Sequence, residues 1–216
     1  MKRLGFAALL LAVPSTASAF QLLGYMWDTD SLPVEFVMSD YLEDSLPQNA
    51  DGTTGLYYQE VSMIRSFCNW HWTDMCEELL PNDEVFDAAP CAEISYNYGG
   101  MVPGNEGPTN DGINKIYFDD PSDDAGVGVN GFMRPRTANV LVKEIAGEFI
   151  YKLVDADIVF NDNIDWGTTE DIEAGCVGGE LAIESTGTHE VGHLWGMGHS
   201  CEQDEPCAND SFLSAT

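Results

Sequence analysis

The sequence His189-Glu-Val-Gly-His193-Leu-Trp-Gly196-Met-Gly-His199-Ser200 contains three of the four histidines of the chain. On a helix, His189 and His193 are four residues apart and project from the same face, so their imidazoles can take two corners of a tetrahedral zinc site. Gly196 can adopt a left-handed conformation at little cost, so the helix can end there and the chain can turn back. The turn then brings in His199 as the third ligand. The stretch therefore predicts a metal centre held by His189, His193 and His199.

This ligand set is typical of a catalytic zinc rather than a structural one. Three protein ligands leave one coordination position open, and a water held there has a pKa of about 7. Glu190 lies one residue round the helix from His189 and can lean over that water. We expect Glu190 to act as general base towards the water and then as general acid towards a leaving amine. Amide hydrolysis is the reaction class that this arrangement favours.

The pattern of the remaining chain predicts an α+β fold. The apolar spacing from Leu56 to Leu80 fits one long amphipathic helix that ends at Pro81, and a second helix over about 184–196 carries the histidines. A single α+β domain over 20–216 follows from this order of elements, because no linker separates them. Short strands are expected at Pro33–Met38, Ala92–Tyr96, Ile113–Phe118 and Gly126–Met133. Phe149–Tyr151 and Asp157–Phe160 belong to a further strand region.

The histidine stretch matches the pattern HExxHxxGxxH, and in this the chain resembles the metzincin zinc metallopeptidases. Ser200 directly after the third histidine is similar to the matrixin branch, the relatives of the matrix metalloproteinases. The residues from Asp155 to Asn161 and Trp166-Gly-Thr168 resemble the strand and loop that precede the active-site helix there. The resemblance implies a twisted five-stranded mixed sheet with two long helices. It also implies a cleft beneath an edge strand, for which 126–133 is the candidate, that pairs with an extended substrate.

Three features differ from the animal matrixins. Metzincins place a methionine turn beneath the zinc after the third histidine, but no methionine follows Met197, so we expect Thr216 to be a truncation point that leaves the C-terminal subdomain incomplete. Only His71 lies outside the histidine stretch, which leaves too few histidines for a second zinc site of the animal type. No cysteine-bearing propeptide lies between Ala19 and the first strand. The last two features suit a compact secreted enzyme of bacterial type.

The first nineteen residues have the pattern of a secretory signal peptide. Lys2-Arg3 supply the positive start, Leu4–Val13 form the apolar run, and Ala17-Ser-Ala19 offer a cleavage site before Phe20. Ten apolar residues are too few to cross a membrane, which takes about 20. The sequence therefore predicts a secreted protein with no membrane segment after removal of residues 1–19.

Secretion favours disulfides among the six cysteines. Cys68 and Cys76 would lie about 12 Å apart along one continuous helix, which is too far for a bond. We therefore expect Cys201–Cys207 as a local loop, Cys76–Cys91 between a helix end and a strand, and Cys68–Cys176 by elimination.

The charge of the chain limits its partners. With 37 Asp+Glu and 8 Lys+Arg the net charge is −29, so the chain repels phosphates and nucleic acid is not an expected partner. Two clusters of aspartates stand out, which are Asp119, Asp120, Asp123 and Asp124, and further along the chain Asp155, Asp157 and Asp162. Their carboxylates are hard oxygen ligands that could bind Ca²⁺, although a solvated acidic face is the favoured interpretation.

Together these features predict a monomeric, secreted zinc endopeptidase that acts on polypeptides. One alternative is a truncated or non-catalytic zinc-binding module that lacks the methionine turn. Another is a zinc hydrolase, such as an amidase, that acts on small molecules and does not use an edge strand. Hydrolysis of casein or gelatin, lost on zinc chelation, separates the first hypothesis from the others.

Overall fold

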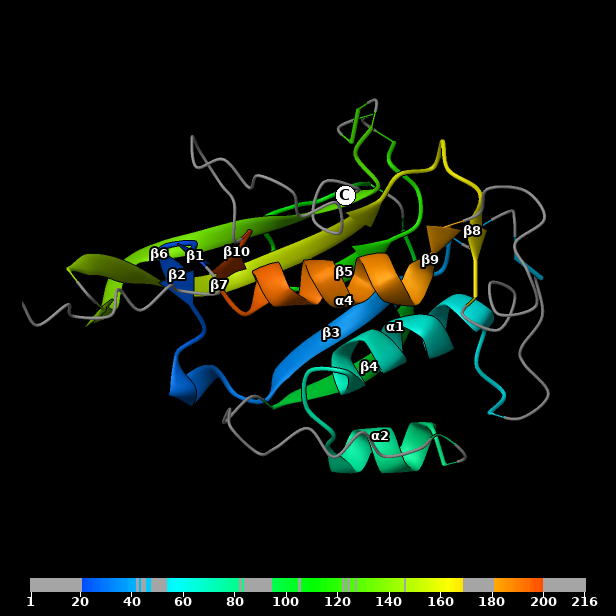
Figure 1. Ribbon diagram of the computed structural model, residues 1–216, viewed down its shortest axis with the longest axis horizontal. Helices are drawn as coiled ribbons and strands as arrows, with labels where there is room; N and C mark the ends of the chain where they lie inside the picture. The colour runs from blue at the N-terminus through cyan, green and yellow to red at the C-terminus, as the bar shows by residue number, and fades with distance from the viewer. Residues whose placement is uncertain are drawn as a thin grey trace, which may run out of the picture.

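The computed structural model describes residues 21–168 and 181–199, apart from positions 42, 44–45, 48–53, 82, 84–94, 105, 122, 124, 127 and 146 (Figure 1). The described residues form an α+β fold with a mostly parallel sheet and three α-helices, as the sequence predicted at this level. The expected signal peptide 1–19 and the expected truncation at Thr216 lie outside the described residues.

The main sheet has the strand order β4-β3-β5-β7-β6, with the short strand β2 beside the beginning of β7. All of these strands run parallel to their neighbours except β6, which is antiparallel to β7. The strands are β2 (Tyr25–Met26), β3 (Val34–Ser39), β4 (Tyr96–Val102), β5 (Asn114–Tyr117), β6 (Gly131–Ile145) and β7 (Glu148–Phe160). The sheet is therefore mixed, and β6 lies at its edge.

Two of the expected strands begin later than predicted. The strand expected at Ala92–Tyr96 lies at β4, from Tyr96 onward, and residues 91–94 are outside the described part of the chain. The edge strand expected at Gly126–Met133 begins only at Gly131 and continues to Ile145. Gly126 and Gly128 have φ values of 61° and 86°, so the chain turns there before it becomes extended.

Two helices, α1 (Tyr58–Cys68) and α4 (Ile183–Leu194), lie side by side over one face of the sheet (Figure 1). Phe67 of α1 stacks on Phe36 of β3 with their ring centroids 3.9 Å apart, and both side chains are fully buried. The apolar face of α1 therefore forms the core with the sheet, while α4 is held between α1 and the edge strand β6.

The single helix predicted over 56–80 is wrong, because the chain breaks it into α1 and α2 (Asp74–Leu79). Residues 69–73 turn the chain between the two helices. This turn brings the Cα atoms of Cys68 and Cys76 to 6.0 Å, and the two cysteines form a disulfide. The expected pairs Cys76–Cys91 and Cys68–Cys176 are therefore also wrong, since each used one of these sulfurs. The expected Cys201–Cys207 pair lies outside the described residues.

Four two-residue strands form two further small sheets. β1 (Gln21–Leu22) pairs antiparallel with β10 (Met197–Gly198), and β8 (Trp166–Gly167) pairs with β9 (Leu181–Ala182), which leads directly into α4. A single 3₁₀ turn, Thr29–Ser31, follows β2. Within the described residues, no helix has the length and apolar character needed to cross a membrane.

Candidate metal centre

The three predicted ligands converge on one point at the end of α4. His189 and His193 project from α4, and Gly196, with φ of 85°, turns the chain back so that His199 faces them. The Nε2 atoms lie 3.0 Å apart for His189 and His193, 3.1 Å for His193 and His199, and 2.9 Å for His199 and His189. Zn–N bonds of about 2.0–2.1 Å in a tetrahedral site place ligand nitrogens roughly 3.3 Å apart. The triangle is therefore close to the size that zinc requires.

The tautomer of His193 also fits a metal ligand. Its Nδ1 lies 2.7 Å from the main-chain oxygen of Met197. Because a carbonyl oxygen only accepts hydrogen bonds, Nδ1 carries the proton, and Nε2 of the neutral ring presents a lone pair. Such a bond from the second ring nitrogen orients a ligating histidine and raises its basicity.

The surroundings of His189 keep its imidazole neutral. Burial, together with the smaller effect of the neighbouring rings of His193 and His199, lowers the pKa of His189 to about 4. At neutral pH the ring is uncharged and its nitrogen lone pair is available. The residues present are thus suited to hold a divalent cation with a preference for nitrogen ligands.

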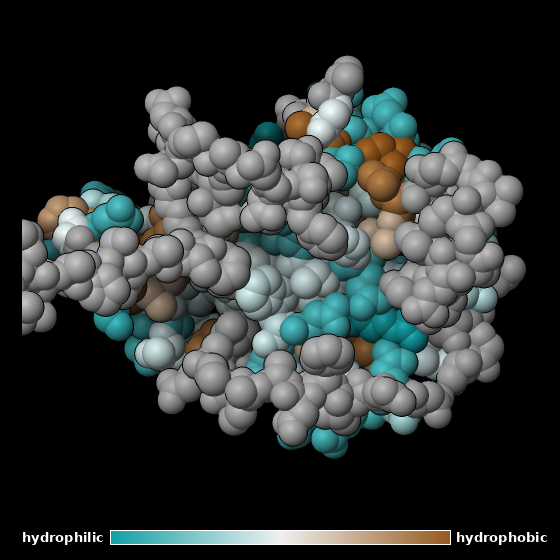
Figure 2. Space-filling model, in the orientation of Figure 1, coloured by the Kyte–Doolittle hydropathy of each residue, from teal (hydrophilic) through white to brown (hydrophobic). Residues whose placement is uncertain are grey.

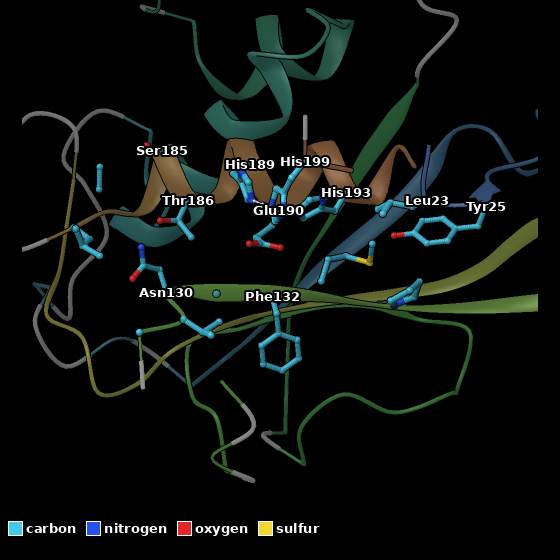
Figure 3. A pocket seen from close by; sticks show the side chains of 17 residues that line it. Leu23, Tyr25, Asn130, Phe132, Ser185, Thr186, His189, Glu190, His193 and His199 are labelled. Atoms are coloured by element: carbon cyan, nitrogen blue, oxygen red, sulfur yellow. Dashed lines mark hydrogen bonds between the residues drawn. The ribbon is translucent and has the colours of Figure 1, made fainter. Parts of the chain in front are cut away.

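The carboxylate of Glu190 lies beside the histidines in the same cleft. Figure 3 shows it between α4 and the strand β6, turned towards the cleft. The side chain is 3 % exposed, and its Oε2 has no hydrogen-bond partner among the described residues. Burial raises the pKa of Glu190 to about 7, although a hydrogen bond from the Met133 main chain acts in the opposite direction. Glu190 is therefore placed and tuned to exchange protons near neutral pH.

The cleft has a volume of about 590 Å³ and runs between α4 and the edge strand β6. One end is polar, with Asn130, Ser185 and Thr186, and the other end is formed by Leu23 and Tyr25 of the N-terminal segment (Figure 3). In the orientation of Figure 1, hydrophilic side chains gather over the middle of the molecule, where α4 and α1 lie (Figure 2). The three histidines lie between the two ends of the cleft.

The structure brings together all four residues that the sequence predicted for the site. The edge strand expected beside the cleft also lies there, as β6 and the residues just before it. Leu23 and Tyr25 are the additions that sequence reasoning missed. They come from a segment far from the histidine stretch, and no local pattern marks them as part of a cleft. Among the described His, Cys, Asp and Glu side chains, the histidines are the group of three whose ligand atoms converge.

Of the predicted cluster of Asp155, Asp157 and Asp162, the first two do not form the solvated acidic face that was favoured, because both are buried and hold a loop. Asp155 Oδ2 accepts main-chain hydrogen bonds from Asp111 and Gly112, and Asp157 accepts them from Thr109 and Lys115. Burial is the main cause that raises the pKa of Asp157 to about 7. No set of three carboxylates converges in the part of the chain that the structure describes, so calcium binding stays a prediction.

No protein-family model, curated protein sequence or solved structure matches the chain. The interpretation of the site therefore rests on its residues and their geometry.

Proposed function

We propose that this protein is a secreted zinc-dependent endopeptidase with a matrixin-like active site. The observation that carries the proposal is the convergence of three histidine Nε2 atoms within 3.1 Å, next to the buried carboxylate of Glu190 in one cleft. The HExxHxxGxxH pattern and the mixed sheet with β6 at its edge agree with it. His189, His193 and His199 are the proposed ligands of one zinc ion.

A bound zinc ion would polarise the substrate carbonyl and acidify a water molecule. The chain supplies the proton transfers. Glu190 takes a proton from the attacking water and later delivers it to the nitrogen of the departing amine. The burial that raises its pKa to about 7 suits both steps, because the group can hold and release the proton near neutral pH.

The outer edge of β6 is the proposed binding surface for the polypeptide. Within the described residues β6 pairs only with β7, so its other edge is without a strand partner and borders the cleft. An extended chain can add to such an edge through main-chain hydrogen bonds, with little demand on its sequence. We therefore infer that unfolded or extended polypeptides are the substrates. The net charge of −29 disfavours acidic ones.

Two observations support secretion. Residues 1–19 have the pattern of a signal peptide, and Cys68 and Cys76 form a disulfide, which persists in oxidising compartments.

The second candidate function is a zinc-binding module without catalysis. It would share the histidine triad, because three converging nitrogens can hold a zinc ion whether or not the protein hydrolyses peptides.

Chelation and reconstitution test the proposal. The purified protein is incubated with unfolded casein before and after treatment with a zinc chelator, and again after addition of one equivalent of zinc. We expect cleavage that chelation abolishes and zinc restores. A protein that binds zinc at the histidines but cleaves neither casein nor gelatin would support the non-catalytic module.

A further inference from the structure

The N-terminal segment Gln21–Met26, here called the strap, lies against the turn that carries the third histidine. β1 pairs antiparallel with β10, in a register that sets Gln21 opposite Gly198 and Leu22 opposite Met197. The main-chain N–H of Leu23 continues this pairing with a hydrogen bond of 2.9 Å to the oxygen of Gly196. The strap therefore contacts the whole of the turn, from Gly196 to Gly198.

The strap is itself fixed to the sheet. β2 pairs with β7, with Tyr25 opposite Tyr151, and the Tyr151 N–H donates to the oxygen of Gly24 at 2.9 Å. The strap also packs closely on the turn, because a Cβ atom on Gly196 would lie 2.3 Å from the main-chain oxygen of Tyr25. The strap thus connects the rigid sheet to the histidine turn.

The turn has contacts on two sides. On the side of α4, the Nδ1 of His193 binds the oxygen of Met197, and on the other side lies the strap. Met197 and Gly198 form β10, and His199 follows directly. Two of the three ligands are held by the helix, whereas the position of His199 depends on β10.

From these contacts we infer that the strap is a positioning element for the third metal ligand. The strap sets the place of His199 through the hydrogen bonds from β1 and Leu23 to the turn, and so raises the affinity of the site for zinc. This inference rests on the proposed zinc centre. A strap that only covers the core would stabilise the fold without changing metal affinity.

Proline substitutions within the strap separate these roles. In an antiparallel pair the residues that exchange hydrogen bonds alternate, so Leu23 and Gln21 direct their N–H groups to β10, whereas the N–H of Leu22 points away from it. Leu23→Pro and Gln21→Pro each remove one N–H that faces the turn. Leu22→Pro is the matched control in the same strand, and Leu23→Ala removes the side chain but keeps the N–H.

Zinc affinity is measured by competition with a chromophoric chelator, and the ligand set by the visible absorption of the cobalt(II) form. Circular dichroism reports whether each variant folds. Gln21→Pro provides the test if Leu23→Pro does not fold. We expect Leu23→Pro and Gln21→Pro to weaken zinc binding roughly fivefold to tenfold, as for the loss of one hydrogen bond, and to alter the cobalt spectrum. Leu22→Pro and Leu23→Ala should stay within about twofold of the parent.

Parental zinc affinity and cobalt spectra in both folded proline variants would overturn the inference, provided that His199→Ala weakens binding. The zinc centre would then stand without a role for the strap. If His199→Ala also binds zinc with the parental affinity, the proposed centre itself is wrong, and the strap inference fails with it.

Discussion

His193 donates a hydrogen bond of 2.7 Å from its Nδ1 to the main-chain oxygen of Met197, which lies four residues further along the chain. This bond links one proposed ligand on α4 to the turn that presents the next proposed ligand, His199. The same bond fixes the ring tautomer, so the Nε2 of His193 faces the other two histidines with its lone pair. The helix and the turn therefore act as one unit in forming the site.

Loss of His199, the proposed third ligand, should weaken zinc binding far more than loss of His71, the histidine outside the motif. We expect His199→Ala to lower zinc affinity by on the order of a hundredfold or more, because even partners outside the ligand shell typically contribute 10–100-fold. His71→Ala is the control, since His71 is not in the converging group. Equilibrium dialysis with zinc measures both. Equal affinities for the two variants would show that the third ligand is misassigned.

The disulfide gives a second prediction, which concerns covalent structure and stability. Proteolytic mapping under non-reducing conditions should recover Cys68 linked to Cys76. Replacing both by serine should lower the free energy of unfolding by about 2–3 kcal/mol, because a short closed loop restricts the unfolded chain. Urea titration measures this difference. A peptide linking Cys68 to Cys176, or Cys76 to Cys91, would contradict the structure.

The convergence of the three histidines was predictable from sequence because the motif lies in eleven consecutive residues. The spacing of His189 and His193 and the glycine at 196 each have a direct geometric meaning on a helix and its end. The edge strand was expected beside the cleft from the resemblance, with 126–133 as its candidate, and residues 128–133 and 135 do line the cleft. The strap was not predicted as part of the cleft. Its place near the histidines is set by strand pairing between distant segments, which a local pattern does not encode.

The break between α1 and α2 was missed for a different reason. Apolar residues on both sides of the break fit one helical period, but none of those that defined the helix lies between Cys68 and Met75. Thr73 and Asp74 in this interval are typical of a helix start, and Thr73 is the N-cap of α2. That signal could have predicted a second helix starting at Thr73, and with it a turn that brings the two cysteines together.

The close approach of α4 to α1 predicts a packing defect at Gly187. A Cβ atom there would lie 2.4 Å from the Oγ of Ser66 and 2.8 Å from the Sδ of Met63. Ser66 cannot move freely, because its hydroxyl donates to the oxygen of Ser62 at 2.8 Å. We expect Gly187→Ala to lower the free energy of unfolding by about 1–3 kcal/mol despite the better helix propensity of alanine. Thermal unfolding measures this, with the exposed Ser185→Ala as the control in the same helix.

The buried carboxyl of Asp157 predicts a pH-dependent stability. Its pKa is raised to about 7, mainly by burial, compared with about 4 in an unfolded chain. The folded protein therefore binds the proton of this carboxyl more tightly than the unfolded chain does. The stabilisation that this proton gives to the folded state is complete below about pH 4 and is lost as the pH rises to about 7. Asp157→Asn should flatten this decline, even if the loss of one acceptor makes the variant less stable. Urea titrations from pH 4 to 8 test it, and an unchanged slope in the variant would contradict the prediction.

The most direct test of the proposed function compares the protein with its Glu190→Gln variant, both loaded with one zinc per chain. The variant keeps all three histidines but cannot accept the proton, so zinc content and fold should be unchanged. Cleavage of an internally quenched peptide should fall by about 10²–10⁴-fold. Equal cleavage by the two zinc-loaded proteins would contradict the role of Glu190, and no cleavage by the parent protein would contradict the proposed peptidase activity.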